Sequence, residues 1–307
     1  MTCVLVTGGS GFVGRAVVPL LIAAGHDVHL LTREGAPVAG CNVHRADLLG
    51  AVPDIIKDIA ADTMLHLAWY AKPGAFWHAP ENLDWVAASL RLVRAFAAGG
   101  GKRLVGVGTC AEYDWGFLEL DEVRTPLRPH TLYGTAKASL YQLLATAATP
   151  LDLSFGWARI FYPYGPHEQA GRLLSSLVDG ARAGSAIACT SGWQSRDFMH
   201  VDDVARALVA FLSGDVTGAV NIAQGRVVRV RDFIETASAL AGGSELVRLG
   251  ARATQAGEPI YMGASVARLR DEVGFVPVYD LAAGIADAVA RRLQSAGRPV
   301  AVDDAGR

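Results

Sequence analysis

Several features that mark metal-binding, redox or disulfide-rich proteins are missing from this 307-residue sequence. Its four cysteines are scattered, and no two of them have the spacing of a metal site or a redox motif: Cys3, Cys41, Cys110 and Cys189. The eight histidines lack a ligand pattern as well, so we predict no metal site. A chain of this length also needs no disulfides, because it can bury a large hydrophobic core.

An excess of one charge and long apolar runs are missing too. The formal net charge is −2 and no basic block is present, so we expect neither nucleic acid nor a membrane as a partner. No apolar run reaches the length that spans a bilayer. The first residues enter a strand without the basic start and cleavage site of a signal peptide. We therefore expect a soluble, cytoplasmic protein.

Short β-branched runs alternate with amphipathic stretches in the first half of the chain. The predicted strands are 3–8, 27–33, 63–69, 102–109 and 151–161, and the predicted helices are 14–25, 82–101 and 132–148. This alternation predicts an α/β fold, a Rossmann-type doubly wound parallel sheet with helices on both faces. From about residue 163 the pattern becomes shorter and less regular, which indicates a smaller C-terminal α/β lobe. A polar tail begins at about Ser295.

The stretch VTGGSGFVG, residues 6–14, lies between the first predicted strand and the first predicted helix. Its glycines are Gly8, Gly11 and Gly14. A dinucleotide's pyrophosphate must approach backbone N–H groups at a helix N-terminus, and β-carbons here would obstruct it. Between a strand and a helix of the first βαβ unit, this spacing predicts a dinucleotide-binding site.

The end of the second predicted strand bears on which dinucleotide binds. An NAD site has a carboxylate there for the ribose 2′-hydroxyl, whereas this chain has Thr32 and Arg33, followed by Glu34. Arg33 can pair with a 2′-phosphate, so we predict NADP rather than NAD. The alternative is that Arg33 is a surface residue and Glu34 supplies the acid. Asp47, after another strand, is expected to bond the adenine amino group or to cap its own loop.

A tyrosine and a lysine stand four residues apart in TLYGTAKASL, residues 131–140. On a helix, Tyr133 and Lys137 share one face. That spacing is common by chance, but further motifs surround it in order: GTCAEYD (108–114), RIFYPYGP (159–166) and SRDFMHVDDVA (195–205). With the glycine motif, they make the chain resemble the extended short-chain dehydrogenase/reductases, especially those that act on nucleotide-sugars.

The resemblance implies roles for three polar side chains. Tyr133 would be the general acid/base, Lys137 would lower its pKa and hold the nicotinamide ribose, and Thr109 would bond the substrate's reacting oxygen. The other reading of Thr109 is a strand-end hydroxyl that satisfies the backbone. The cofactor-binding residues would be Gly8, Gly11, Phe12, Val13, Gly14, Thr32, Arg33, Asp47, Leu48, Leu67, Ala68, Tyr133 and Lys137.

Within this family, dehydratases carry an Asp–Glu pair directly after the Thr. Here those positions are Cys110 and Ala111, which can neither protonate a leaving hydroxyl nor remove a proton. Glu112 comes one residue late and would point elsewhere in an extended segment. A 4-ketoreductase that consumes NADPH and a 4-epimerase that retains NAD therefore stay open, and Thr32 and Arg33 favour the reductase. A protein that only senses NADP is a further alternative.

The resemblance assigns the substrate to the other end of the fold. Residues 1–162 would form the NADP-binding domain, rejoined by about 197–223, and residues 163–307 would mainly form the substrate lobe. Arg196 matches the arginine that grips a sugar nucleotide's diphosphate, or else pairs with Asp197 or Asp202. Two departures from the family, Tyr162 for an asparagine and Gln255 for a second arginine, keep a non-sugar carbonyl open as substrate.

Further substrate contacts are expected beside the third predicted strand and the catalytic threonine. Trp69, Lys72 and Cys110 are the candidates, although the aromatic residues after that strand are equally consistent with a packed loop. Arg252 lies near Gln255 in the sequence and is a candidate to replace the missing arginine. The helix at 82–101 and the Tyr133 helix carry apolar residues on more than one face, and the resemblance implies a homodimer through these two helices.

Overall fold

The computed structural model describes residues 2–34, 36–50, 54–254 and 257–295. Among these residues, one seven-stranded sheet is entirely parallel and has the order β11, β7, β5, β4, β1, β2, β3. Its strands are β1 (Cys3–Thr7), β2 (Asp27–Thr32), β3 (Asn42–Arg45), β4 (Thr63–His66), β5 (Arg103–Thr109), β7 (Ser154–Ile160) and β11 (Gly218–Ile222). The strand order reverses between β1 and β4, which is where open α/β sheets bind ligands at their carboxyl ends.

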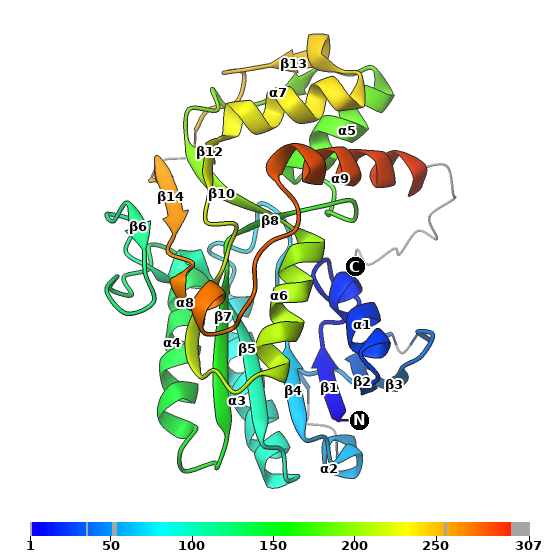
Figure 1. The fold of residues 1–307 in the computed structure, drawn as a ribbon, viewed down its shortest axis with the longest axis vertical. Helices are drawn as coiled ribbons and strands as arrows, with labels where there is room; N and C mark the ends of the chain where they lie inside the picture. The colour runs from blue at the N-terminus through cyan, green and yellow to red at the C-terminus, as the bar shows by residue number, and fades with distance from the viewer. Residues whose placement is uncertain (1, 35, 51–53, 255–256, 296–307) are drawn as a thin grey trace.

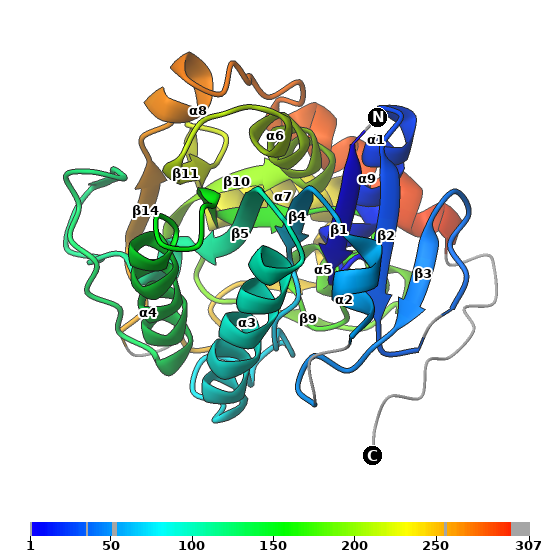
Figure 2. The same ribbon diagram turned by 90° about the horizontal axis from the view of Figure 1, so that it is seen from below.

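Helices cover both faces of this sheet (Figures 1 and 2). They are α1 (Gly14–Ala23) and α6 (Val201–Ser213) on one face, and α2 (Ile55–Ile59), α3 (Glu81–Ala98) and α4 (Leu132–Ala147) on the other. Side chains alternate along each strand, so Val4 and Val6 pack with α1 and α6 whereas Leu5 packs with α3 and α4. The predicted doubly wound α/β fold is confirmed.

The rest of the chain forms a smaller region above the carboxyl ends of the large sheet (Figure 1). Its strands are β6 (Glu119–Leu120), β8 (Tyr162–Tyr164), β9 (Ile187–Ala188), β10 (Ser195–His200), β12 (Val227–Arg229), β13 (Val247–Arg248) and β14 (Tyr261–Ala264). Strand β10 pairs with β8, β12 and β14. Its helices are α5 (Leu173–Ala183), α7 (Val230–Ala241) and α9 (Leu281–Ser295), which share an apolar core.

Two later segments return to the large sheet. Helix α6 packs on α1, and β11 extends the sheet beside β7. The short helix α8 (Ala267–Asp271) then lies against β11. Both regions therefore meet at the carboxyl ends of β1, β4, β5 and β7, which puts residues from the two halves of the chain around one site. In the part of the chain that the structure describes, no helix is long and apolar enough to cross a membrane.

Candidate active site

The glycine loop after β1 is held by close backbone contacts. Gly8 has a φ of +72°, and a β-carbon on it would lie 2.6 Å from the backbone nitrogen of Ala68. A β-carbon on Gly14 would collide with the Gly8 carbonyl oxygen. These two glycines therefore let the loop, the start of α1 and the segment after β4 pack against one another. The sequence prediction invoked only the approach of a pyrophosphate and missed this packing requirement.

The N-terminus of α1 is suited to an anion. Val13 precedes the helix without a side-chain cap, and no acidic residue lies in the first turn, so no side chain competes with a phosphate for this end of the helix dipole. Phe12 lies near Gly165, where a β-carbon would be 3.6 Å from its ring. Leu67 and Ala68 are half-buried beside the loop. The residues present thus fit a dinucleotide's pyrophosphate.

The carboxyl ends of β2 and β3 carry two arginines. Thr32 pairs in register with Arg45, and the Arg45 side chain donates a hydrogen bond to the Arg33 carbonyl at 3.2 Å. Both arginine side chains are exposed. Sequence reasoning considered Arg33 alone. It missed Arg45, because the pairing of β2 with β3 brings the two together across twelve residues.

The predicted adenine contact has a local role in this structure. Asp47 accepts a hydrogen bond from the Leu49 N–H at 3.1 Å, which makes it the cap of its own turn. Leu48 is buried in the core beside α3. The loop-capping alternative for Asp47 is thus realised, while its contact with adenine stays a prediction.

Tyr133 and Thr109 meet at the end of β5. Burial raises the pKa of the Tyr133 phenol well above its ordinary value, and the nearby Thr109 side chain partly offsets that shift. The rings of Phe76 and Trp77 contact the Tyr133 ring edge-on, with centroids at 4.9 and 5.9 Å. The Trp77 carbonyl also accepts the Tyr133 N–H at 3.0 Å. The aromatic residues after β4 therefore hold the phenol in place.

Lys137 is buried one turn along α4 from Tyr133. Its ammonium donates a hydrogen bond to the Val107 carbonyl at 2.7 Å and lies 3.8 Å from the centre of the Trp69 ring. Burial lowers the pKa of Lys137 to about 7, and the charge of Glu112 opposes that shift. Trp69 is itself fixed by a 2.8 Å hydrogen bond to Asn82. The structure thus gives Trp69 a place against Lys137, and its contact with substrate stays a prediction.

A buried ion pair supports the turn that carries Thr109. Residues Cys110–Glu112 form a 3-10 turn, not an extended segment, and Glu112 points into the core with no exposed surface. Its carboxylate accepts hydrogen bonds from the Thr109 N–H at 2.8 Å and from Arg159 at 2.7 Å. Trp157 donates to both carboxylate oxygens. Glu112 is thus committed to holding the turn and does not face the reacting group.

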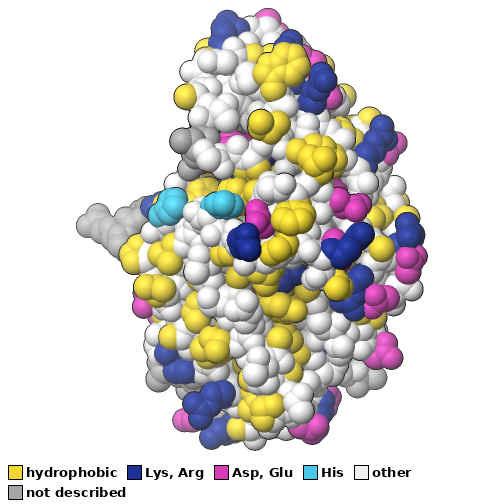
Figure 3. All heavy atoms as spheres, turned by 90° about the vertical axis from the view of Figure 1, so that its left-hand side faces the viewer, with side chains coloured by type: hydrophobic (Ala, Val, Ile, Leu, Met, Phe, Trp, Pro, Cys, Tyr) yellow, Lys and Arg dark blue, Asp and Glu magenta, His cyan; other side chains and the backbone are white. Residues whose placement is uncertain are grey.

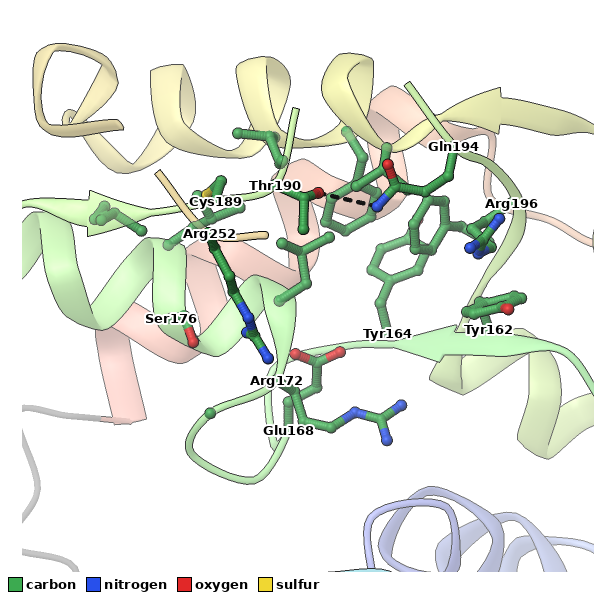
Figure 4. Close-up of a pocket in the computed structure, with 18 of the residues that line it drawn as sticks. Tyr162, Tyr164, Glu168, Arg172, Ser176, Cys189, Thr190, Gln194, Arg196 and Arg252 are labelled. Carbon is green, nitrogen blue, oxygen red and sulfur yellow. Dashed lines mark hydrogen bonds between the residues drawn. The ribbon is translucent and has the colours of Figure 1, made fainter. Parts of the chain in front are cut away.

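A pocket of about 300 Å³ opens in the upper region between β8, β10, α5 and α7. Tyr162 and Arg196 stand together on its wall (Figure 4), with the guanidinium 5.2 Å from the centre of the phenol ring. Arg196 is nearly fully buried and donates a 2.7 Å hydrogen bond to Glu258. The alternative partners expected from the sequence are engaged elsewhere, because Asp197 accepts backbone N–H groups and Asp202 pairs with Arg291.

Two more arginines line the same pocket. Arg172 precedes α5, and Arg252 follows β13. In Figure 4 the Arg252 guanidinium points toward Glu168, and the Arg172 side chain runs to one side of that carboxylate. Burial raises the pKa of the Glu168 carboxyl to about 7 against the charge of Arg172. Arg252 was a sequence candidate for a second phosphate-binding arginine, whereas Arg172 was missed because it lies in no recognisable motif. Gln255 lies outside the described residues.

The remaining predicted contacts differ in burial. Cys110 is buried beside Thr109, and burial raises the pKa of its thiol to about 12, although the charge of Arg196 opposes the shift. The side chain of Lys72 is exposed in the loop after β4. Cys110 therefore lies near both Thr109 and Arg196, while Lys72 is exposed to solvent.

Comparison with known proteins agrees with this geometry. The model of the NAD dependent epimerase/dehydratase family matches residues 4–223. A UDP-glucose 4-epimerase from Corynebacterium glutamicum is 26% identical, over 92% of this chain and 94% of its own. A dTDP-6-deoxy-L-talose 4-dehydrogenase (NAD(+)) from Aggregatibacter actinomycetemcomitans is 25% identical, over 76% of this chain and 88% of its own.

A solved structure of MoeE5 in complex with UDP-glucuronic acid and NAD is also similar. It is 29% identical with a TM-score of 0.83, and the match covers 95% of this chain and 99% of that one. The family match spans more than half of this chain and includes the glycine loop, Thr109, Tyr133 and Lys137. This chain is therefore an enzyme of the NAD dependent epimerase/dehydratase family, within the extended short-chain dehydrogenase/reductases.

Proposed function

We propose that this enzyme uses NADPH to reduce the C4 ketone of a nucleotide-linked 4-keto-6-deoxysugar. The observation that carries the proposal is the proximity of two hydroxyl groups, those of Tyr133 and Thr109, between the glycine loop and the arginine-lined pocket. Cys110 and Ala111 stand beside them, and neither is an acid or base for dehydration. A reduction that needs one hydride and one proton is the chemistry these groups can complete.

Each residue has one task in that reaction. Bound NADPH supplies the hydride that C4 receives. The Tyr133 hydroxyl gives its proton to the C4 oxygen, and the Thr109 hydroxyl orients that oxygen by a hydrogen bond. Lys137 offers a positive charge next to the phenolate that results, which lowers the cost of forming it in a buried site. Solvent then returns a proton to Tyr133.

The preference for NADPH rests on the two arginines at the ends of β2 and β3. Arg33 and Arg45 are joined by a hydrogen bond between the Arg45 side chain and the Arg33 backbone. Two guanidinium groups beside Thr32 suit a 2′-phosphate, whereas a ribose 2′-hydroxyl calls for a carboxylate. The arginine-lined pocket suits the diphosphate of the substrate. Tyr162 and the buried thiol of Cys110 offer few polar groups, which fits a sugar that lacks a 6-hydroxyl.

The test is consumption of NADPH, followed by its absorbance, with UDP-, dTDP- and CDP-linked 4-keto-6-deoxyhexoses. We expect turnover with one nucleotide series, and Tyr133→Phe to lower kcat by about 10²- to 10⁴-fold. Tyr141→Phe is the matched control, since Tyr141 lies two turns along the same helix. Full activity of Tyr133→Phe would rule out the assigned acid, and consumption of a non-sugar ketone alone would rule out the substrate class.

An epimerase that retains NAD is the second candidate. It is favoured by one of the curated relatives, a UDP-glucose 4-epimerase whose match covers 92% of this chain. An epimerase returns the hydride to the other face of C4 and consumes no cofactor. The test is whether the purified protein carries stoichiometric NAD and interconverts UDP-glucose and UDP-galactose without added cofactor. Both results together would favour the epimerase over the reductase.

We further propose that the enzyme is a homodimer through α3 and α4. These helices pack side by side, and each exposes a large apolar side chain, Leu83 on α3 at 60% and Leu143 on α4 at 49%. Figure 3 shows hydrophobic side chains scattered in small groups over the face to which α4 belongs. Light scattering should give twice the chain mass, and Leu143→Glu should shift it to the monomer. A monomeric wild type would refute the dimer.

A further inference from the structure

A second cluster of reactive side chains lies at the other end of the large sheet. Cys3 on β1 pairs in register with Asp27 on β2, and His29 on β2 pairs with Asn42 on β3. Because side chains alternate along strands, these four residues and His44 lie on one face of the sheet, the face that α2 covers. They are at the beginnings of the strands, whereas the catalytic residues follow the strand ends.

Three of these side chains present potential metal ligands to one another. The Cys3 sulfur, a carboxylate oxygen of Asp27 and a ring nitrogen of His29 all lie within 4.8 Å of one another. His29 Nε2 is 3.3 Å from Asp27 Oδ2. A tetrahedral zinc ion, at about 2.0–2.3 Å from its ligands, keeps neighbouring ligand atoms roughly 3.3–3.8 Å apart. The pair from β2 is already at that spacing, and the Cys3 thiol would turn to the metal from its 3.9 Å contact with the Ile59 carbonyl.

The side chains of Asn42 and His44 contact these ligands and orient them. Asn42 Nδ2 donates to Asp27 Oδ1 at 2.9 Å, which leaves Oδ2 directed at His29. His29 Nδ1 lies 2.9 Å from His44 Nε2. With its proton on Nδ1, His29 donates to His44, and its Nε2 accepts from Asn42 Nδ2 at 3.2 Å, a contact that a bound metal would replace. Contacts of this kind fix the tautomer and direction of metal ligands.

We propose that Cys3, Asp27 and His29 bind a Zn²⁺ ion, with water as the fourth ligand. A thiol, an imidazole and a carboxylate together match the ligands that zinc takes in proteins. All three side chains are half-buried, so the ion can enter from solvent. Zinc binding releases the thiol proton of Cys3 as the sulfur–zinc bond forms.

The other cluster of this type among the described residues is a poorer candidate. His200, Asp202 and Asp287 also lie within 4.8 Å of one another. The Arg291 guanidinium, however, bonds both carboxylates, at 2.6 and 3.0 Å. A cation there would have to displace this guanidinium, whereas no arginine or lysine is bonded to Asp27 among the described residues.

The test is zinc content and zinc affinity of the full chain, by dialysis and calorimetry. We expect one zinc ion per chain, a zinc-dependent rise in Tm, and loss of this stoichiometric ion in Cys3→Ser. The matched control is Cys41→Ser, because Cys41 is also half-buried and precedes β3 but packs against the opposite core. The control should keep its zinc. Cobalt in place of zinc should show a thiolate charge-transfer band that Cys3→Ser lacks.

A second variant separates binding from folding. His44→Gln leaves all three ligands in place, and we expect it to weaken zinc binding by about 10- to 100-fold. The Tm of each variant in the presence of a chelator shows whether it folds. Absence of zinc from the wild type, an unchanged affinity in Cys3→Ser, or an equal loss in Cys41→Ser would each overturn the site.

Discussion

The cofactor end and the substrate end of this site are built by different means. At the cofactor end, backbone contacts shape the site: Gly8 packs on Ala68, Gly14 packs on Gly8, and α1 begins without a side-chain cap. At the substrate end, charged side chains from distant segments line one pocket. A backbone site is encoded in a short stretch of sequence, whereas a side-chain site is assembled by the fold. Substitutions at each end of the site test whether the two ends differ in this way.

The largest effect is expected where the two ends join, at Glu112. In Glu112→Gln the buried Arg159 guanidinium loses its charged partner, so we expect the free energy of unfolding to fall by about 3–5 kcal/mol. Because the Thr109 turn loosens, kcat should fall more than KM rises. Urea unfolding and steady-state kinetics measure the two effects. Glu119→Gln, at an exposed site, is the control. If Glu112→Gln unfolds with the same free energy as the wild type, the Glu112–Arg159 ion pair does not stabilise the fold.

The next effect tests whether backbone contacts decide cofactor binding. Gly8→Ala puts a β-carbon 2.6 Å from the Ala68 nitrogen at a φ of +72°, which adds a clash to a backbone strain of about 1–3 kcal/mol. We expect severe loss of dinucleotide affinity, measured by fluorescence titration. Gly25→Ala has a φ of +79° with no atom within 4 Å of the new carbon. If Gly8→Ala and Gly25→Ala bind the dinucleotide equally well, the close packing at Gly8 does not determine dinucleotide affinity.

A smaller effect tests the side-chain end. Arg196→Ala removes a charged hydrogen-bond donor from the pocket and leaves Glu258 unpaired. With a charged hydrogen bond at about 1.5–3 kcal/mol, the substrate KM should rise by roughly 10- to 100-fold, while the affinity for NADPH stays the same. Arg252→Ala, at a more exposed position, should raise KM less. A rise in the Kd for NADPH would contradict the division of the site into two ends.

The smallest effect concerns the choice of dinucleotide. Arg33→Ser and Arg45→Ser each remove one exposed charge, and exposed ion pairs contribute about 0.2–1 kcal/mol. Each variant should therefore weaken NADPH binding by a few fold and leave NADH binding unchanged, with a larger effect in the double variant. Arg94→Ser, exposed on α3, is the control. Equal weakening of both dinucleotides would remove the argument for NADPH.

The same contrast explains how much could be predicted from the sequence. Strand–helix periodicity predicted the parallel sheet, and the glycine spacing predicted the cofactor loop, because both signals are local. The spacing of Tyr133 and Lys137 is common by chance, so it indicated a functional pair only together with the neighbouring motifs. Fold-level contacts escaped prediction: Arg45 reaches Arg33 only because β2 pairs with β3, and Arg172 joins Arg196 and Arg252 only in three dimensions.

Glu112, the last residue of the 3-10 turn that follows Thr109, shows a second limit. Sequence reasoning expected Glu112 to point away from the substrate, but on the assumption of an extended segment. The segment is a 3-10 turn, and the carboxylate is capped by the Thr109 N–H and paired with Arg159. Its partner lies 47 residues away, so no local pattern could reveal the buried pair.

The Arg196–Glu258 ion pair gives the pocket a threshold for entry. Before any ligand arrives, the guanidinium has already satisfied its charge with a carboxylate at 2.7 Å. A ligand with one negative charge gains little binding free energy by displacing Glu258 from Arg196, because one anionic partner is exchanged for another. A doubly charged ligand has Arg172 and Arg252 as further partners in the same pocket. We therefore expect the pocket to favour ligands that carry at least two negative charges.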